Sequence, residues 1–135
     1  MSRPTAEMRR EVVRRANGRC EYCLVHEADS AARHQVDHVI AIKHGGVTDL
    51  SNLALSCLLC NRRKASDIGA TDPDSGQFVR LFHPRAQSWA DHFEIVANEI
   101  RGRTTNGRAT AEFLQFNLPD RLQERAALMD AGRLP

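Results

Sequence analysis

All four cysteines of this chain fall into two CxxC pairs, and this pattern constrains the fold more than any other feature. The pairs are Cys20–Cys23 and Cys57–Cys60, with residues 24–56 between them. The two thiolates of a CxxC turn can both point at one tetrahedral zinc ion. In a chain without a secretory signal, paired CxxC motifs favour a metal site over disulfides. We therefore expect a structural zinc on Cys20, Cys23, Cys57 and Cys60, with redox-active or unliganded cysteines as the alternatives.

The size and composition of the chain are those of an ordinary globular protein, which a structural metal site would help to stabilise. The chain has 135 residues, of which 41% are hydrophobic and 27% charged. A domain of this length has little surplus burial, so an internal metal site would help it to fold. The sequence contains no apolar run long enough for a membrane span, and its first residues lack the apolar centre of a signal peptide. We expect a cytoplasmic protein without a membrane partner.

The spacing of apolar residues predicts the order of elements in the first half. A helix is expected over about residues 4–17, where Asn17-Gly18 is a stop signal. Branched residues predict a strand over 34–42, followed by a loop at 44–46 and a second short strand within 48–55. A helix should then run from Cys57 to about Ser66. The predicted core is strand, loop, strand, helix, enclosed between the two cysteine pairs.

Four polar residues between and beside the cysteines could carry chemistry. A carboxylate such as Asp37 is a good ligand for a hard divalent cation, and an imidazole such as His38 is a good base for water near neutral pH. Asn61, early in the last helix, could add an oxygen ligand, and Asn52 could hold the imidazole or the loop in place. Taken singly, each also suits a structural role in a turn or a helix cap.

Together these motifs resemble the HNH endonuclease family. The resemblance rests on CEYC at 20–23, VDHVIAIKHGG at 36–46, Asn52-Leu53 and CLLCNRRK at 57–64, and it covers roughly the first half of the chain. It implies an α+β protein whose ββα-metal core, also called the HNH or His-Me finger fold, is stabilised by zinc on four cysteines. An N-terminal helix would precede this core and a small mixed extension would follow it.

The resemblance also implies roles for individual residues. On matching positions, Asp37 and Asn61 would bind the catalytic cation, His38 would be the general base, and Asn52 would orient that base. Asn61 stands where the family name has its final His. Because Asp37 and Asn61 both offer oxygen, the site should prefer Mg²⁺ or Mn²⁺.

The implied function is metal-dependent hydrolysis of phosphodiester bonds in nucleic acid, with DNA favoured. The net charge of +2 is weakly basic, but Arg62, Arg63 and Lys64 form a local basic group that could neutralise phosphates. Two alternatives stay open. One is a zinc module that binds DNA or protein without cleaving, and the other is a nuclease subunit that needs a targeting partner. The adjacent Asp37 and His38 argue against the first, because a zinc scaffold needs neither.

The second half is less distinctive, and we expect a domain division into an HNH core at 1–68 and an extension at 69–135 packed on the same domain. Expected in turn are a linker at 69–76, a strand within 77–84, a short helix within 85–93, a hairpin over 93–103, a turn at 105–107, and helices over 109–116 and 119–129. Trp89, Phe93, Phe113 and Phe116 should form a small core rather than stack on bases.

Overall fold

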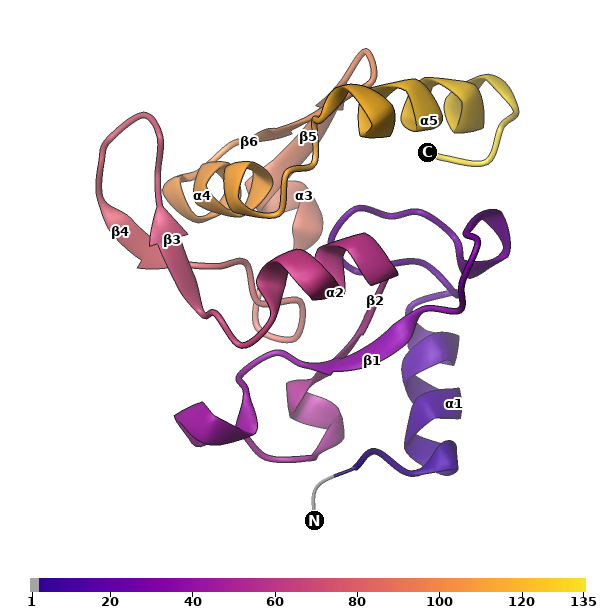
Figure 1. The fold of residues 1–135 in the computed structure, drawn as a ribbon, viewed down its shortest axis with the longest axis vertical. Coiled ribbons are helices and arrows are strands. Elements are labelled where there is room, and N and C mark those ends of the chain that lie inside the picture. The colour runs from indigo at the N-terminus through magenta and orange to yellow at the C-terminus, as the bar shows by residue number, and fades with distance from the viewer. Residues whose placement is uncertain (1–2) are drawn as a thin grey trace. The chain divides into compact units, whose positions relative to one another are not determined.

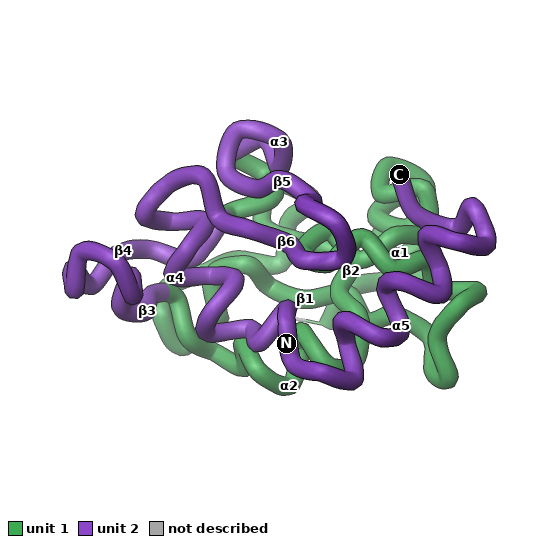
Figure 2. Tube along the Cα trace, turned by 90° about the horizontal axis from the view of Figure 1, so that it is seen from above, with its two compact units in different colours: residues 1–68, 83–86 green, residues 69–82, 87–135 purple. Residues whose placement is uncertain are grey.

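The computed structural model of this chain describes residues 3–135 and divides into two compact units (Figures 1 and 2). Unit 1 comprises the described residues up to Ile68 together with His83–Ala86. Unit 2 comprises Gly69–Phe82 and Gln87–Pro135. Helices and small antiparallel sheets make up both units, so the α+β class is confirmed. None of the helices described in residues 3–135 combines the length and the apolar character that crossing a membrane requires.

Unit 1 begins with helix α1 (Ala6–Arg15), as the apolar spacing predicts. Thr5 caps its start, because the Thr5 side chain accepts a hydrogen bond of 3.1 Å from the Met8 amide. The helix ends where Asn17 and Gly18 adopt left-handed backbone angles, and the Gly18 amide donates back to the Val13 carbonyl at 3.0 Å. This turn delivers the chain directly to the first cysteine pair.

The predicted strand, loop, strand, helix order is confirmed. Strands β1 (Gln35–His38) and β2 (Leu53–Ser56) pair antiparallel, with Asp37 opposite Ala54 and His38 opposite Leu53. Helix α2 (Leu58–Lys64) follows at once, and the Cys57 sulfur at its N-cap accepts from the Cys60 amide at 3.4 Å. Strand β1 is shorter than the predicted 34–42, because beyond His38 the backbone bonds to the side chain of Asn52 rather than continuing the ladder.

The two faces of the β1–β2 hairpin are covered by different helices. Because side chains alternate along a strand, Leu53 and Leu55 share one face, where they pack against Val12 of α1 in a buried apolar cluster. Asp37 lies on the opposite face, where it pairs with Lys64 of α2. The hairpin therefore places an apolar core on one side and a polar, partly charged contact on the other.

Short 3₁₀ turns connect these elements: η1 (Glu27–Asp29), η2 (Ile42–His44) and η3 (Leu50–Asn52). The loop that joins the two strands needs both of its glycines. Gly45 ends η2 in the left-handed region, at φ 91°. A Cβ added at Gly46 would lie 1.7 Å from the Ile40 carbonyl oxygen, so the loop folds tightly back on the end of β1.

Unit 2 is built from two separate hairpins and the remaining helices. Its elements are β3 (Gly69–Thr71), β4 (Phe78–Arg80), α3 (Trp89–His92), β5 (Phe93–Val96), β6 (Glu99–Gly102), α4 (Thr105–Phe113) and α5 (Pro119–Asp130). Strand β3 pairs with β4, and β5 pairs with β6, both antiparallel.

Two expectations for this half were wrong. The segment 69–76, expected to be a linker, starts with a strand, because Asp72 organises a tight turn in which its amide donates to the Gln77 carbonyl at 2.8 Å. The expected turn at 105–107 is the first turn of α4. Thr104 caps this helix by accepting from the Gly107 amide at 3.1 Å. Gly107 fits because its missing Cβ would meet the His92 carbonyl oxygen at 2.0 Å.

Aromatic side chains form the centre of unit 2, as expected. The ring centroid of Phe93 lies 5.1 Å from that of Trp89, 5.2 Å from that of Phe82 and 5.8 Å from that of Phe116. Phe82, Phe93 and Phe116 are buried, so they are not presented to bases. Phe113 contributes elsewhere, against a small cluster of Ala70, Leu81 and Ala109.

Candidate metal and nuclease site

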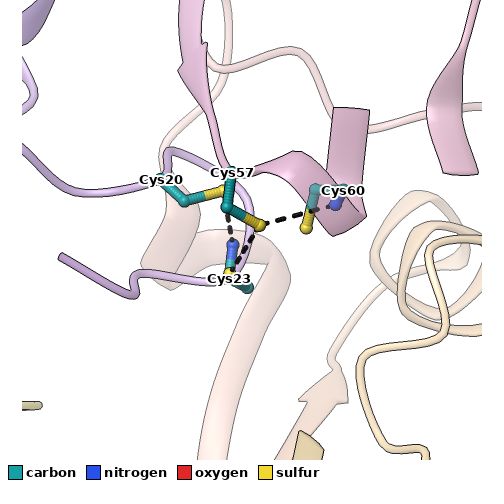
Figure 3. Close-up of side chains that lie close together, drawn as sticks. All are labelled: Cys20, Cys23, Cys57 and Cys60. Carbon is teal, nitrogen blue, oxygen red and sulfur yellow. Dashed lines mark hydrogen bonds between the residues drawn. The ribbon is translucent and has the colours of Figure 1, made fainter. Parts of the chain in front are cut away.

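The four cysteines meet at one point in unit 1 (Figure 3). Cys20 and Cys23 come from the turn after α1, and Cys57 and Cys60 from the junction of β2 and α2. All four sulfur atoms lie within 4.8 Å of one another, and the sulfurs of Cys23 and Cys57 are 3.6 Å apart. All four residues are buried. The site thus ties the chain before the hairpin to the helix after it.

The donor set fits zinc. Four sulfur ligands in two CxxC turns are the usual shell of a closed structural zinc site. Backbone amides already point at the sulfurs: Cys23 donates to the Cys20 sulfur at 3.5 Å, and Cys60 to the Cys57 sulfur at 3.4 Å. Burial raises the pKa of the Cys20 thiol well above its usual value, so a cation is needed to hold that sulfur as thiolate.

Asp37 lies on β1 with 9% of its surface exposed, facing α2. Its Oδ2 atom is 3.0 Å from the Lys64 ammonium, and the buried Tyr22 hydroxyl lies near enough to the same carboxylate to affect its pKa. Burial raises the pKa of Asp37, although Lys64 and Tyr22 both act in the opposite direction. The carboxylate is therefore paired with Lys64 of α2 and lies near Tyr22 of the first cysteine turn.

The sequence groups Lys64 with Arg62 and Arg63 as a possible phosphate contact, but the Lys64 side chain is buried. Arg62 and Arg63 are exposed, but Lys64 is 2% exposed. Its ammonium pairs with Asp37 and donates to the His38 carbonyl at 3.2 Å. The helix turns Lys64 inward because it lies one turn after Asn61, on the side of α2 that faces β1. The structure therefore does not present Lys64 to a phosphate.

His38 is the last residue of β1, and its half-buried ring extends from the opposite side of the strand to Asp37. Its Nε2 atom lies 2.8 Å from the Thr48 hydroxyl oxygen. Because this contact engages Nε2, the nitrogen available to a water molecule is Nδ1. The strand terminates at His38, which lets two adjacent residues diverge without a bulge.

Asn52 holds the loop that follows His38. Its Oδ1 accepts from the Ile40 amide, while its Nδ2 donates to the carbonyls of Ile40 and Val47, each at 2.9 Å. Its own carbonyl accepts from the Val39 amide at 2.9 Å. The side chain is buried, so these bonds are shielded from water. Asn52 thus fixes the loop backbone, whereas the contact to the His38 ring comes from Thr48.

Asn61 lies on α2 opposite Gln35, two residues before Asp37 on β1. Its Nδ2 donates to the Gln35 side-chain oxygen. This bond directs the Asn61 Oδ1 atom, the one able to ligate a cation, away from Gln35. Asp37 of β1 thus pairs with Lys64 of α2, and Asn61 of α2 bonds to Gln35 of β1, so both contacts lie between the same strand and helix.

Sequence reasoning missed three residues that position this site: Tyr22, Gln35 and Thr48. Gln35 could have been found, because it lies two residues before Asp37 and so shares its face of the strand. Tyr22 was visible inside the first CxxC, yet nothing in the sequence shows that its hydroxyl reaches Asp37. The contact of Thr48 with His38 could not be predicted, because it depends on how the loop between β1 and β2 folds.

The fold and the site together define a ββα module whose four clustered cysteines suit a structural zinc. Residues 20–67 match the family model described as HNH endonuclease. This segment is therefore similar to an HNH endonuclease domain, and the match ends just before unit 2 begins. No curated protein and no solved structure matches the chain.

Proposed function

We propose that this protein is a metal-dependent endonuclease that hydrolyses phosphodiester bonds, with DNA as its substrate. The observation that carries the proposal is the arrangement at the end of β1. There Asp37 and His38 leave the strand on its two sides, and Thr48 engages one nitrogen of the imidazole. A scissile phosphate at this strand end would meet the base from one side and the cation ligands from the other.

His38 is the proposed general base. In the tautomer whose Nε2–H donates to the Thr48 hydroxyl, Nδ1 is unprotonated and can take the proton of a water molecule that attacks phosphorus. Asn52 keeps the following loop in one conformation through its bonds to Ile40 and Val47, so the ring starts from a fixed backbone. This preorganisation is the contribution we assign to Asn52.

Asp37 and Asn61 are the proposed ligands of a catalytic Mg²⁺ or Mn²⁺. One carboxylate and one amide oxygen are hard donors that suit such an ion, which keeps several waters of its own. When bound, the cation would stabilise negative charge on the phosphoryl and leaving oxygens. Gln35 orients the Asn61 amide for this role, and Lys64 pairs with the Asp37 carboxylate.

Arg62 and Arg63 are the proposed phosphate contacts. Both are exposed on α2, immediately after Asn61. Cations in this position would neutralise phosphates that flank the scissile bond, and their contribution should weaken with added salt.

The test compares His38→Ala with His44→Ala, a matched control because His44 is an exposed histidine in the neighbouring loop. His38→Ala should lose on the order of 10² to 10⁴-fold in cleavage of plasmid DNA. It should retain its zinc and its DNA affinity, whereas His44→Ala should cleave like the parent. If His38→Ala cleaves as fast as the parent, His38 is not the base.

A second comparison separates chemistry from binding. Arg62→Ala should weaken DNA binding and reduce the slope of log affinity against log salt by about one. It should leave the cleavage rate of saturated enzyme close to that of the parent. A zinc module that binds without cleaving would instead show the Arg62 effect together with no cleavage by any variant.

A further inference from the structure

We propose that Lys64 is a built-in cation that competes with the divalent metal for Asp37, and so sets how weakly the site holds its metal. This inference rests on the proposed function, because it takes Asp37 as a metal ligand. It gives Lys64 a role different from that of Arg62 and Arg63, its neighbours on α2.

The geometry singles out Lys64. Its side chain is 2% exposed, its ammonium lies 3.0 Å from the Asp37 Oδ2 atom, and it donates to the His38 carbonyl at 3.2 Å. A lysine is rarely this buried unless it is paired. Here one ammonium contacts both consecutive residues of the proposed site, so its charge acts where the metal charge would act.

A fixed positive charge beside a carboxylate must weaken the attraction of that carboxylate for a second cation. The effect is large because both groups are buried, and buried charges are screened much less than charges in water. Asp37 can then release Oδ2 from Lys64 when a metal enters, or can share itself between the two. In both cases the metal binds against repulsion, which favours a loosely held ion.

Tyr22 provides the contrast that distinguishes charge from simple positioning. Its side chain is fully buried and its hydroxyl interacts with the same carboxylate, but it carries no charge. Removing the Tyr22 hydroxyl or the Lys64 ammonium takes away a polar group beside Asp37. Removing Lys64 also deletes a repulsive charge, so the two changes should have opposite effects on metal affinity.

The experiment measures the dissociation constant for Mn²⁺ in zinc-loaded protein without DNA, by electron paramagnetic resonance of unbound Mn²⁺ at pH 8. Lys64→Met should bind Mn²⁺ more tightly, by on the order of tenfold. Lys64→Gln, which keeps a donor for the His38 carbonyl, should do the same and serves if Lys64→Met does not fold. Tyr22→Phe should bind as weakly as the parent or more weakly. Arg62→Met, which removes an exposed charge nearby, should change affinity by less than about twofold.

The variant Asp37→Asn distinguishes a failure of the Lys64 inference from a failure of the proposed metal site. If Asp37→Asn abolishes Mn²⁺ binding but both Lys64 variants bind no more tightly than the parent, the competing role of Lys64 is overturned and the metal site stands. Weaker binding in both Lys64 variants and in Tyr22→Phe would show positioning alone, which also overturns it. If Asp37→Asn binds Mn²⁺ like the parent, the proposed metal site is wrong, and the inference about Lys64 is wrong with it.

Discussion

Units 1 and 2 bury their interiors by different means. In unit 1 the apolar cluster around Val12, Leu53 and Leu55 is small, and four cysteines gather in place of a larger core. In unit 2 the centre is aromatic, around Phe93. A zinc ion on these cysteines would therefore supply stability that the small apolar cluster of unit 1 lacks, whereas unit 2 has the packing of an ordinary small core.

Buried charge is also treated differently in the two units. Lys64 in unit 1 pairs with the carboxylate of a proposed active-site residue. In unit 2 the buried Arg125 donates to the carbonyls of Phe116 and Asn98, each at 2.8 Å, and so satisfies backbone groups near the ends of α4 and β5. The buried cation of unit 1 therefore pairs with a carboxylate, whereas the buried Arg125 of unit 2 binds backbone carbonyls.

The largest effect should follow from breaking the cysteine cluster. Cys57→Ser removes one of the four sulfur ligands, while the serine hydroxyl can still cap the start of α2, so the change isolates the loss of metal binding. Because structural zinc contributes about 10 to 16 kcal/mol of folding free energy in small peptides, we expect residues 20–67 to lose protection in hydrogen exchange. Unit 2 should stay protected over β5, β6 and α5. A Cys57→Ser protein that holds zinc and protects residues 20–67 like the parent would contradict the account.

A smaller effect should follow from opening the aromatic core. Phe93→Ala should destabilise unit 2 by about 3 to 5 kcal/mol, because it leaves a cavity among Trp89, Phe82 and Phe116. Zinc content and protection of residues 20–67 should be unchanged. Phe78→Ala is the control, since Phe78 is 74% exposed and its loss should cost less than about 0.5 kcal/mol. Equal losses in the two variants, measured by denaturant unfolding, would count against this core.

The smallest expected effect is on the stability of unit 2 at acidic pH. Arg108 contacts both Asp72 oxygens at 3.0 Å and holds the pKa of that carboxyl well below its usual range. The folded pKa lies below the unfolded value of about 3.9, so the pair stabilises unit 2 above that pH. The stabilisation is lost as pH falls from about 5 to 2.

Asp72→Asn should remove this loss, so the stability of unit 2 should depend less steeply on pH in that range. Asp130→Asn, at an exposed carboxylate near the end of α5, is the matched control and should follow the parent. The measurement is hydrogen exchange of unit 2 across the acid range. Parallel curves for the parent and Asp72→Asn would show that the Arg108 contact is not made in solution.

The sequence predicts unit 1 well because its signals are local. The CxxC spacing brings the sulfurs together, and short-range periodicity locates α1, β1, β2 and α2. What local signals could not show is how α2 is rotated against β1. That rotation decides that Asn61 faces Gln35 and that Lys64, which looks like part of a basic surface run, points inward to Asp37.

Unit 2 was harder to predict because its structure depends on long-range bonds made by turn-forming residues. Asp72 reads as part of a loop, yet Arg108, far along the chain, fixes it. Residues 105–107 read as a turn, yet the cap from Thr104 and the close approach of Gly107 to His92 make them the start of α4. Asn117 similarly bonds the Ile100 amide at 3.0 Å and its carbonyl at 2.8 Å, a pairing across two elements that no short pattern reveals.

The most direct test of the proposed nuclease is cleavage of plasmid DNA by the zinc-loaded parent protein with Mg²⁺ or Mn²⁺ added. Asp37 and Asn61 offer oxygen, so we expect nicking with either ion, its loss on brief chelation, and its return when the ion is restored, with the zinc on the four cysteines retained throughout. Zinc content is measured in every sample. Absence of cleavage with either metal, or cleavage that continues unchanged after chelation, would contradict the account.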